Sequence, residues 1–259
     1  MEYPAENIKL IRSRDNDFYK KLKSYGQSKY RKRDNCLIAD GEKVYQEARS
    51  RLKLLYTIVS ESYFETHLHP QIADEDGSKL TVFADNLFES LSECKTSQGI
   101  LGVFEIPIFK LETATLNRVA VLEGIQDPKN VGAIIRNAHC LGYEAVFLGE
   151  GCATAFSPKV IRSSMGSVFH IPTLSADGSI EGIIQDLKAA GFSVVGTASS
   201  GSEEVRQFEK IALIIGSEGS GLSEQTTALC DHLFRIKISP SAESLNAAVA
   251  SGIAMYVHN

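Results

Sequence analysis

The sequence lacks several features that would assign a protein class directly. No segment has the length of apolar residues that a membrane-spanning helix needs, and residues 1–10 contain neither a secretory signal nor an Arg-rich transit peptide. The five cysteines include no C-x-x-C pair: Cys36, Cys94, Cys140, Cys152 and Cys230. This spacing favours reduced, mostly buried thiols. Together these absences predict a soluble, cytoplasmic protein without a membrane partner.

Patterns typical of metal sites and of repeat proteins are also missing. His67 and His69 lie two positions apart, but no second ligand cluster or H-E-x-x-H helix accompanies them. We therefore interpret both as surface imidazoles and expect no metal. The sequence contains no internal repeat and no low-complexity tract.

Basic residues are scarcer than acidic ones, and they are distributed unevenly. The net charge of −5 is not typical of a nucleic-acid-binding protein. However, ten lysines and arginines lie between Lys9 and Arg33, with tyrosines among them, against only Asp15 and Asp17. Charge alone leaves two interpretations open: an RNA-binding segment, or a solvated amphipathic helix followed by a polar loop.

The hydropathy pattern divides the chain near residue 110. Residues 7–24 have the spacing of an amphipathic helix, and short apolar runs then alternate with helical stretches, which predicts a small α/β domain over 1–106. The runs are Cys36–Ala39, Leu54–Val59, Leu80–Phe83 and Ile100–Phe104, and the helical stretches are Val44–Arg51, Tyr63–Leu68 and Leu87–Cys94. Residues 107–116 show little periodicity and indicate a linker.

Five apolar segments after the linker indicate a parallel sheet with helices on both faces. They are Val119–Leu122, Ala145–Leu148, Phe192–Val195, Ile211–Ile215 and Leu233–Ile238. Ligands bind in such sheets where loops leave the carboxyl ends of the strands. The loops that follow these segments are therefore the candidates for a functional site.

The first candidate segment runs from Asn130 to Ala138. We interpret Asn130 as a helix N-cap, and the apolar residues after it share one face of the helix. Arg136 lies on the opposite side at about 100° per residue. Its guanidinium is thus predicted to point toward solvent, a ligand or another subunit.

Two later segments have residue types that suit close backbone approach. Gly216–Gly221 follows the apolar run Ile211–Ile215, and its three glycines let backbone amides reach a ligand. Ser244 is interpreted as the N-cap of the C-terminal helix, with Leu245 and Asn246 in its first turn. The small side chains that follow fit either close packing within one chain or a subunit interface.

These three segments, in this order, resemble the motifs of the SpoU/TrmH family of RNA ribose 2'-O-methyltransferases. The resemblance covers residues 117–259, and the N-terminal part more weakly resembles the small substrate-binding domain of many members. It implies an α/β fold whose parallel sheet carries a C-terminal trefoil knot, and a homodimer. It also implies S-adenosylmethionine as cofactor, held by the second and third motifs: Gly216, Glu218, Gly219, Ile236, Ile238 and Leu245.

The activity that the resemblance implies is methyl transfer to a ribose 2'-hydroxyl, with ribosomal RNA favoured over transfer RNA. Arg136 of a partner subunit would complete the site. Because an arginine is normally always protonated, we interpret Arg136 as a stabiliser of the developing alkoxide, with proton removal by Arg136 left open. Ser244 and Asn246 are predicted to position the ribose. The predicted RNA contacts are Asn130, Lys29, Arg31, Lys32 and Arg33.

Two other functions fit parts of the sequence. A catalytically silent RNA-binding or ribosome-assembly factor with the same knot is suggested by residues 236–240, which read Ile-Lys-Ile-Ser-Pro where many relatives read Ile-Pro-Met. A nucleotide-binding α/β enzyme of another type could use Gly216–Gly221 for phosphate. The absence of the G-x-G-x-x-G fingerprint and of a phosphate-loop lysine counts against the second possibility.

Overall fold

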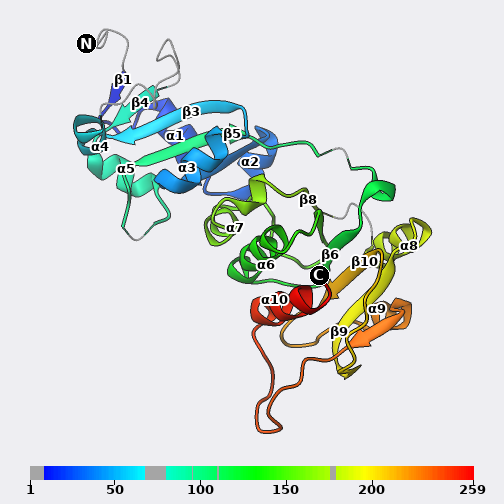
Figure 1. The fold of residues 1–259 in the computed structure, drawn as a ribbon. Coiled ribbons are helices and arrows are strands. Elements are labelled where there is room, and N and C mark those ends of the chain that lie inside the picture. The colour runs from blue at the N-terminus through cyan, green and yellow to red at the C-terminus, as the bar shows by residue number, and fades with distance from the viewer. Residues whose placement is uncertain (1–8, 68–79, 95, 110, 176–178) are drawn as a thin grey trace. The chain divides into compact units, whose positions relative to one another are not determined.

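The chain forms two compact units, each with its own β-sheet (Figure 1). The computed structural model describes residues 9–67, 80–94, 96–109, 111–175 and 179–259. The first unit comprises residues 1–107 with 156–158, and the second comprises 108–155 and 159–259.

The first unit is built on a mixed sheet of five strands. Their order is β1 (Lys9–Ile11), β4 (Leu80–Phe83), β3 (Leu54–Ser60), β5 (Ile100–Glu105) and β2 (Cys36–Asp40). The first three run parallel, and β5 is antiparallel to both of its neighbours. The helices are α1 (Asp17–Ser24), α2 (Ser28–Arg33), α3 (Glu42–Arg49), α4 (Glu61–Thr66) and α5 (Asp85–Leu91). All four predicted apolar runs lie in strands. Each predicted helical stretch is helical only in part, over 44–49, 63–66 and 87–91, and Leu68 lies outside the described residues.

The predicted helix over 7–24 is wrong in its first half. Residues 7 and 8 lie outside the described residues, and Lys9–Ile11 forms strand β1, which pairs with β4 from Lys9 opposite Thr81. Asn16 is the N-cap of α1, because its side-chain oxygen accepts hydrogen bonds from the amides of Phe18 and Tyr19. The pairing partner is some 70 residues away along the chain, so local spacing could not reveal it.

The second unit contains a fully parallel sheet of six strands. Their order is β11 (His232–Phe234), β9 (Ser193–Ser202), β10 (Ile211–Ile215), β6 (Arg118–Leu122), β7 (Ala145–Leu148) and β8 (Thr173–Ser175). The strand β8 was not predicted, and the last predicted strand is shorter than expected, because residues 235–238 lie outside β11. The helices are α6 (Pro128–Cys140), α7 (Pro158–Ser163), α8 (Ile180–Ala189), α9 (Glu224–Leu229) and α10 (Ala247–Val257), with 3₁₀ turns at Thr113–Thr115 and Ser167–Phe169.

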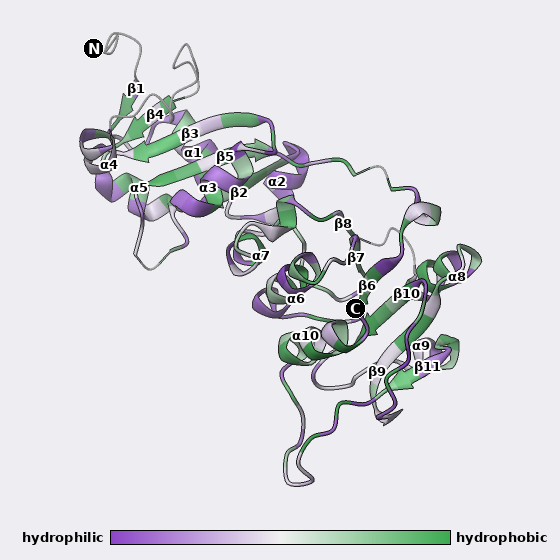
Figure 2. Cartoon of the chain, viewed as in Figure 1, coloured by the Kyte–Doolittle hydropathy of each residue, from purple (hydrophilic) through white to green (hydrophobic). Residues whose placement is uncertain are grey.

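Helices cover both faces of this sheet, as near-continuous apolar strands predict. On one face, Ile184 and Leu187 of α8 pack against Val121, Ala212 and other strand residues. On the opposite face lie α6 and α10, which pack against each other, and α10 also contacts β10 (Figure 1). Figure 2 shows the hydrophobic residues concentrated in the central strands and along α10. Because β6, β9 and β10 run parallel, their carboxyl ends lie at the same end of the sheet.

The residues described by the structure form no helix that is both long and apolar enough to span a membrane. Within the same residues, no group of three or more potential ligands could hold a metal ion. His67 stacks on Tyr63 with ring centroids 4.2 Å apart, and His69 lies outside the described residues. None of the five cysteines, all among the described residues, forms a disulfide; Cys36 is buried and Cys140 is exposed, so the prediction of mostly buried thiols is only partly correct.

Replacing Leu213 by Ala tests the packing of β10 at the centre of the sheet. Leu213 is completely buried in the centre of the sheet, so we expect the second unit to lose about 2–5 kcal/mol of unfolding free energy. The measurement is calorimetry of the full chain, with Val205→Ala as control, because Val205 is 46% exposed. Equal shifts in the two variants would show that the sheet centre is not a tightly packed core.

Candidate functional site

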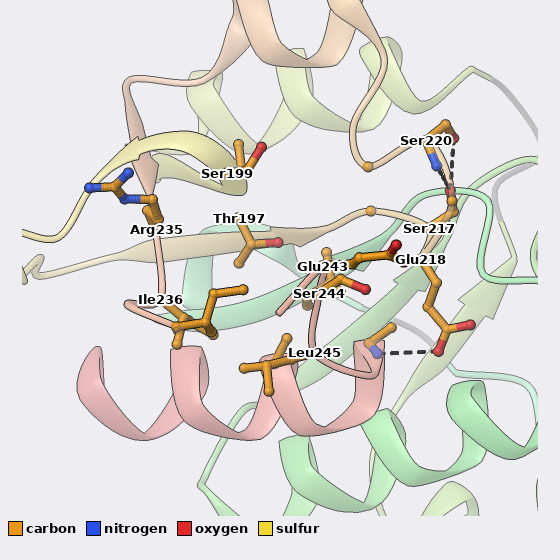
Figure 3. A pocket seen from close by; sticks show the side chains of 18 of the residues that line it. Thr197, Ser199, Ser217, Glu218, Ser220, Arg235, Ile236, Glu243, Ser244 and Leu245 are labelled. Atoms are coloured by element: carbon orange, nitrogen blue, oxygen red, sulfur yellow. Dashed lines mark hydrogen bonds between the residues drawn. The ribbon is translucent and has the colours of Figure 1, made fainter. Parts of the chain in front are cut away.

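A cavity of about 410 Å³ opens at the carboxyl ends of β9, β10 and β11 (Figure 3). Residues from four chain segments line it: Thr197–Ser199; Ile215–Gly221; Phe234–Ile236 with Ile238; and Glu243–Leu245 with Ala247 and Ala250. Seven residues predicted from the second and third motifs are among them: Gly216, Glu218, Gly219, Ile236, Ile238, Ser244 and Leu245. The second and third segments singled out in the sequence therefore meet in one cavity.

The glycine-rich loop after β10 closes on itself immediately after the strand. Ser217 and Gly221 exchange two backbone hydrogen bonds of 3.0 and 3.2 Å, and the Ser217 hydroxyl accepts a bond from the Ser220 amide. A Cβ on Gly216 would lie 2.4 Å from the carbonyl carbon and oxygen of Gly221. Only glycine therefore fits at Gly216, whereas Gly219 has open space around it.

A register shift between β9 and β11 allows residues of β9 to line the cavity. The register with β11 jumps, since Leu233 pairs with Gly196 but Phe234 pairs with Ser202. The intervening residues of β9 have no partners on β11, and Thr197 to Ser199 line the cavity instead. Sequence reasoning missed these residues, although they follow the predicted strand Phe192–Val195 and lie at the strand end where ligands bind.

The C-terminal helix begins two residues later than predicted. Asn246, not Ser244, is its N-cap, because the Asn246 side-chain oxygen accepts hydrogen bonds from the amides of Ala248 and Val249 at 3.0 and 3.3 Å. Leu245 and Asn246 thus precede the first turn. Ser244 is exposed and its side chain lines the cavity (Figure 3).

The first-motif helix also begins earlier than predicted. Its N-cap is Asp127, whose carboxylate accepts a bond of 2.9 Å from the Lys129 amide, and Pro128 opens the helix. Asn130 therefore lies inside the first turn, and it is 8% exposed. Because Asp127 caps the helix, the Asn130 side chain is available for contacts with the other two motifs.

Three side chains, one from each motif, form a hydrogen-bonded cluster: Asn130, Glu218 and Asn246. The Asn130 amide donates to Glu218 Oε1 at 2.6 Å, and the Asn246 amide donates to the same oxygen at 2.8 Å and to Asn130 Oδ1 at 3.0 Å. The backbone N–H of Ala247 donates a third bond to Glu218 Oε1, at 3.3 Å (Figure 3). The carboxylate thus ties the β10 loop to the starts of α6 and α10.

Arg136 projects away from this packed face of α6. Val131, Ile134, Ile135 and Ala138 are buried, and Arg136 is exposed, as the helical spacing predicts. Among the residues that the structure describes, no hydrogen-bond or ion-pair partner of Arg136 is found. Asn137, one residue on, donates a 2.8 Å bond to the carbonyl of Ala248 and so fixes α6 against α10.

The four basic residues predicted to contact RNA lie on α2, but they differ in exposure. Lys29, Lys32 and Arg33 are exposed, and Arg33 forms an ion pair of 2.6 Å with Asp34. Arg31, in contrast, is 6% exposed and donates to the carbonyl of Tyr25. Burial lowers the pKa of Arg31. Its predicted role as a phosphate contact does not agree with this burial, and Arg31 instead supports the turn after α1.

Comparison with known proteins identifies the family. The family model described as SpoU rRNA Methylase matches residues 117–256. The chain belongs to the SpoU rRNA methylase family. It is 34% identical over 252 residues to the 23S rRNA (guanosine(2553)-2'-O)-methyltransferase RlmP of Bacillus subtilis. The aligned region covers 96% of this chain and 98% of the relative.

Solved structures of SpoU and TrmH methyltransferases share the fold over most of the chain. An AdoMet-bound rRNA methyltransferase from Sinorhizobium meliloti is 26% identical, with a TM-score of 0.83 over 97% of each chain. A TrmH-family RNA methyltransferase from Porphyromonas gingivalis is 27% identical, with a TM-score of 0.79 over 92% of this chain and 95% of the other. The chain is accordingly an S-adenosylmethionine-dependent RNA 2'-O-methyltransferase of the SpoU family.

The cavity suits S-adenosylmethionine in size and chemistry. Its volume lies within the range of small-molecule sites, and such sites combine apolar walls with a few polar groups. Ile236 and Leu245 offer apolar walls on which an adenine can pack (Figure 3). Serine hydroxyls, backbone groups and two carboxylates supply the polar contacts.

Alanine substitutions at two glycines of the loop after β10 test whether the backbone shape of this loop is needed for cofactor binding. In Gly216→Ala the new methyl group collides with Gly221, so we expect S-adenosylmethionine binding to weaken roughly tenfold or more. In Gly219→Ala the methyl group meets no protein atom within 4 Å, so the loop should keep its backbone shape and binding should weaken less than in Gly216→Ala. Isothermal titration measures both, and an unaffected Gly216→Ala protein would refute the assignment of this loop to the cofactor site.

Proposed function

We propose that this protein methylates a ribose 2'-hydroxyl of ribosomal RNA in the cytoplasm, with S-adenosylmethionine bound in the cavity at the carboxyl ends of β9, β10 and β11. The observation that carries this proposal is the convergence of three motif segments on one cluster beside that cavity. The choice of ribosomal RNA rests on the Bacillus subtilis relative, whose name gives 23S rRNA as its substrate.

We further propose that the C-terminal segment forms a trefoil knot. The strand β11 lies at the edge of the sheet, yet α10 packs against β10 in its interior and against α6. The connecting segment, residues 235–246, must therefore cross back over β9, and its end is bonded to Glu218 in the loop after β10. Threading of the tail through that loop region is consistent with these contacts.

A homodimer is the proposed assembly. The helix α10 has one buried face and a second face with three exposed apolar or aromatic residues at positions i, i+4 and i+7: Val249, Ile253 and Tyr256. Figure 2 shows the helix as hydrophobic over most of its length. Such a stripe is typical of a subunit interface. Because α6 packs on α10, a partner on this stripe would lie close to the free Arg136 of the neighbouring helix.

The proposed mechanism assigns different tasks to the motif residues. When bound, S-adenosylmethionine supplies the activated methyl group. Arg136 of the partner subunit would stabilise the alkoxide that develops on the ribose and orient a neighbouring phosphate. Ser244, with an exposed side chain on the cavity, would bind the ribose. Asn246 has both amide hydrogens and its oxygen already bonded. We therefore propose that Asn246 positions the start of α10 against the other two motifs and does not bind the ribose itself.

The remainder of the chain would recognise the RNA. We propose residues 1–106 as a small RNA-binding domain, 107–116 as a linker and 117–259 as the catalytic domain. Lys29 and Arg33 flank the ring of Tyr30 at 4.8 and 5.3 Å, which gives α2 a surface of cations and an aromatic ring. Such a surface suits phosphates and unstacked bases.

Mixing two inactive variants tests whether Arg136 acts from the partner subunit. Arg136→Ala and Asn246→Ala should each abolish methylation. A mixed dimer regains one complete site, so random exchange should restore about a quarter of wild-type turnover. Methyl incorporation into RNA measures the recovery, and S-adenosylmethionine affinity of Arg136→Ala should stay unchanged. No recovery on mixing, despite exchange of subunits, would assign Arg136 to its own subunit's site or to none.

Salt dependence tests the RNA-binding role of α2. In a Lys29→Ala, Lys32→Ala, Arg33→Ala variant, we expect weaker RNA binding and a salt slope reduced by roughly 0.7–0.9 for each lost phosphate contact. Lys43→Ala, an exposed lysine on α3, is the control for a single charge. An unchanged slope in the triple variant would place the RNA elsewhere on the protein.

A further inference from the structure

The cavity contains one carboxylate that no role described so far uses. Among its lining residues in the described chain, Glu218 and Glu243 are the two acidic side chains. Glu218 Oε1 accepts three side-chain and backbone hydrogen bonds and belongs to the motif cluster. Glu243 is exposed and has no hydrogen-bond or ion-pair partner in the described residues.

Among the described residues that line the cavity, the cationic side chain is Arg235, and it is already paired. Arg235 forms an ion pair of 2.9 Å with Glu203, which also lies 3.6 Å from Lys237. In Figure 3 Arg235 points away from the cavity, whereas Glu243 extends over it from the segment before Ser244, toward the loop that holds Ser217. Glu243 therefore carries a negative charge that no described residue compensates, and its side chain extends over the cavity.

We propose that Glu243 makes the site selective for the positively charged methyl donor over its neutral product. This inference rests on the proposed function, because it places the donor sulfonium near Ser244, where the ribose would bind. Methyl transfer breaks the S–CH₃ bond and forms an O–CH₃ bond. The bonding electron pair stays on the sulfur, which becomes a neutral thioether, and the hydroxyl proton passes to water. The attraction of Glu243 for the sulfonium centre thus disappears with the reaction, which favours exchange of product for fresh donor.

The size of the effect follows from Coulomb's law for a carboxylate and a sulfonium that are partly screened by solvent. A unit charge about 5 Å away, partly screened by solvent, changes affinity by about three- to thirtyfold. The neutral thioether should respond by less than about twofold. Both forms share the adenosine and the amino-acid groups, so their ratio isolates the sulfonium charge.

Isothermal titration of the full chain with three ligands tests this proposal. In Glu243→Gln, S-adenosylmethionine and the cationic amine analogue sinefungin should bind about three- to thirtyfold more weakly, and S-adenosylhomocysteine should be almost unaffected. Glu243→Asp should retain most of the selectivity. Glu209→Gln is the matched control, because Glu209 is exposed and precedes the amino end of β10, away from the cavity.

The possible outcomes separate this proposal from the function on which it rests. Equal weakening of all three ligands would overturn it, because the carboxylate would then bind a group that donor and product share. Unchanged affinities would overturn it as well. A wild-type protein that binds none of the three ligands would instead refute the proposed cofactor site.

Discussion

The site depends on one carboxylate that joins three distant parts of the chain. Glu218 receives hydrogen bonds from Asn130, Asn246 and the backbone of Ala247, so the starts of α6 and α10 are fixed to the loop after β10. Hydrogen bonds to a charged acceptor are stronger than neutral ones, and loss of the acceptor would leave several donors without a partner. The cluster also holds the cavity wall at Leu245, because Leu245 directly precedes the bonded Asn246.

Most of the fold could be predicted because its information is local. Apolar runs such as Ile211–Ile215 favour strands that are buried between two layers of helices, and the structure places them there. The errors arise where a distant partner decides the conformation. Lys9–Ile11 is a strand because β4 lies beside it, and β8 is a three-residue strand with little pattern of its own.

The site was predictable as a set of loops but not in its details. Ser244 and Asn246 are both good N-cap residues, and only the bonds from the amides of Ala248 and Val249 distinguish them. The contribution of Thr197–Ser199 depends on a register jump between β9 and β11, which spacing does not encode. Arg31 has the same charge as its neighbours on α2, yet its burial gives it a structural role.

A double-mutant cycle between Asn130 and Glu218 tests the central claim most directly. The affinity for S-adenosylmethionine would be measured in Asn130→Ala, in Glu218→Ala and in the double variant. If the cluster acts as a unit, either single change disrupts it, and the double variant binds about as weakly as the worse single one. Losses in binding free energy that simply add would contradict the account, because the two side chains would then act independently.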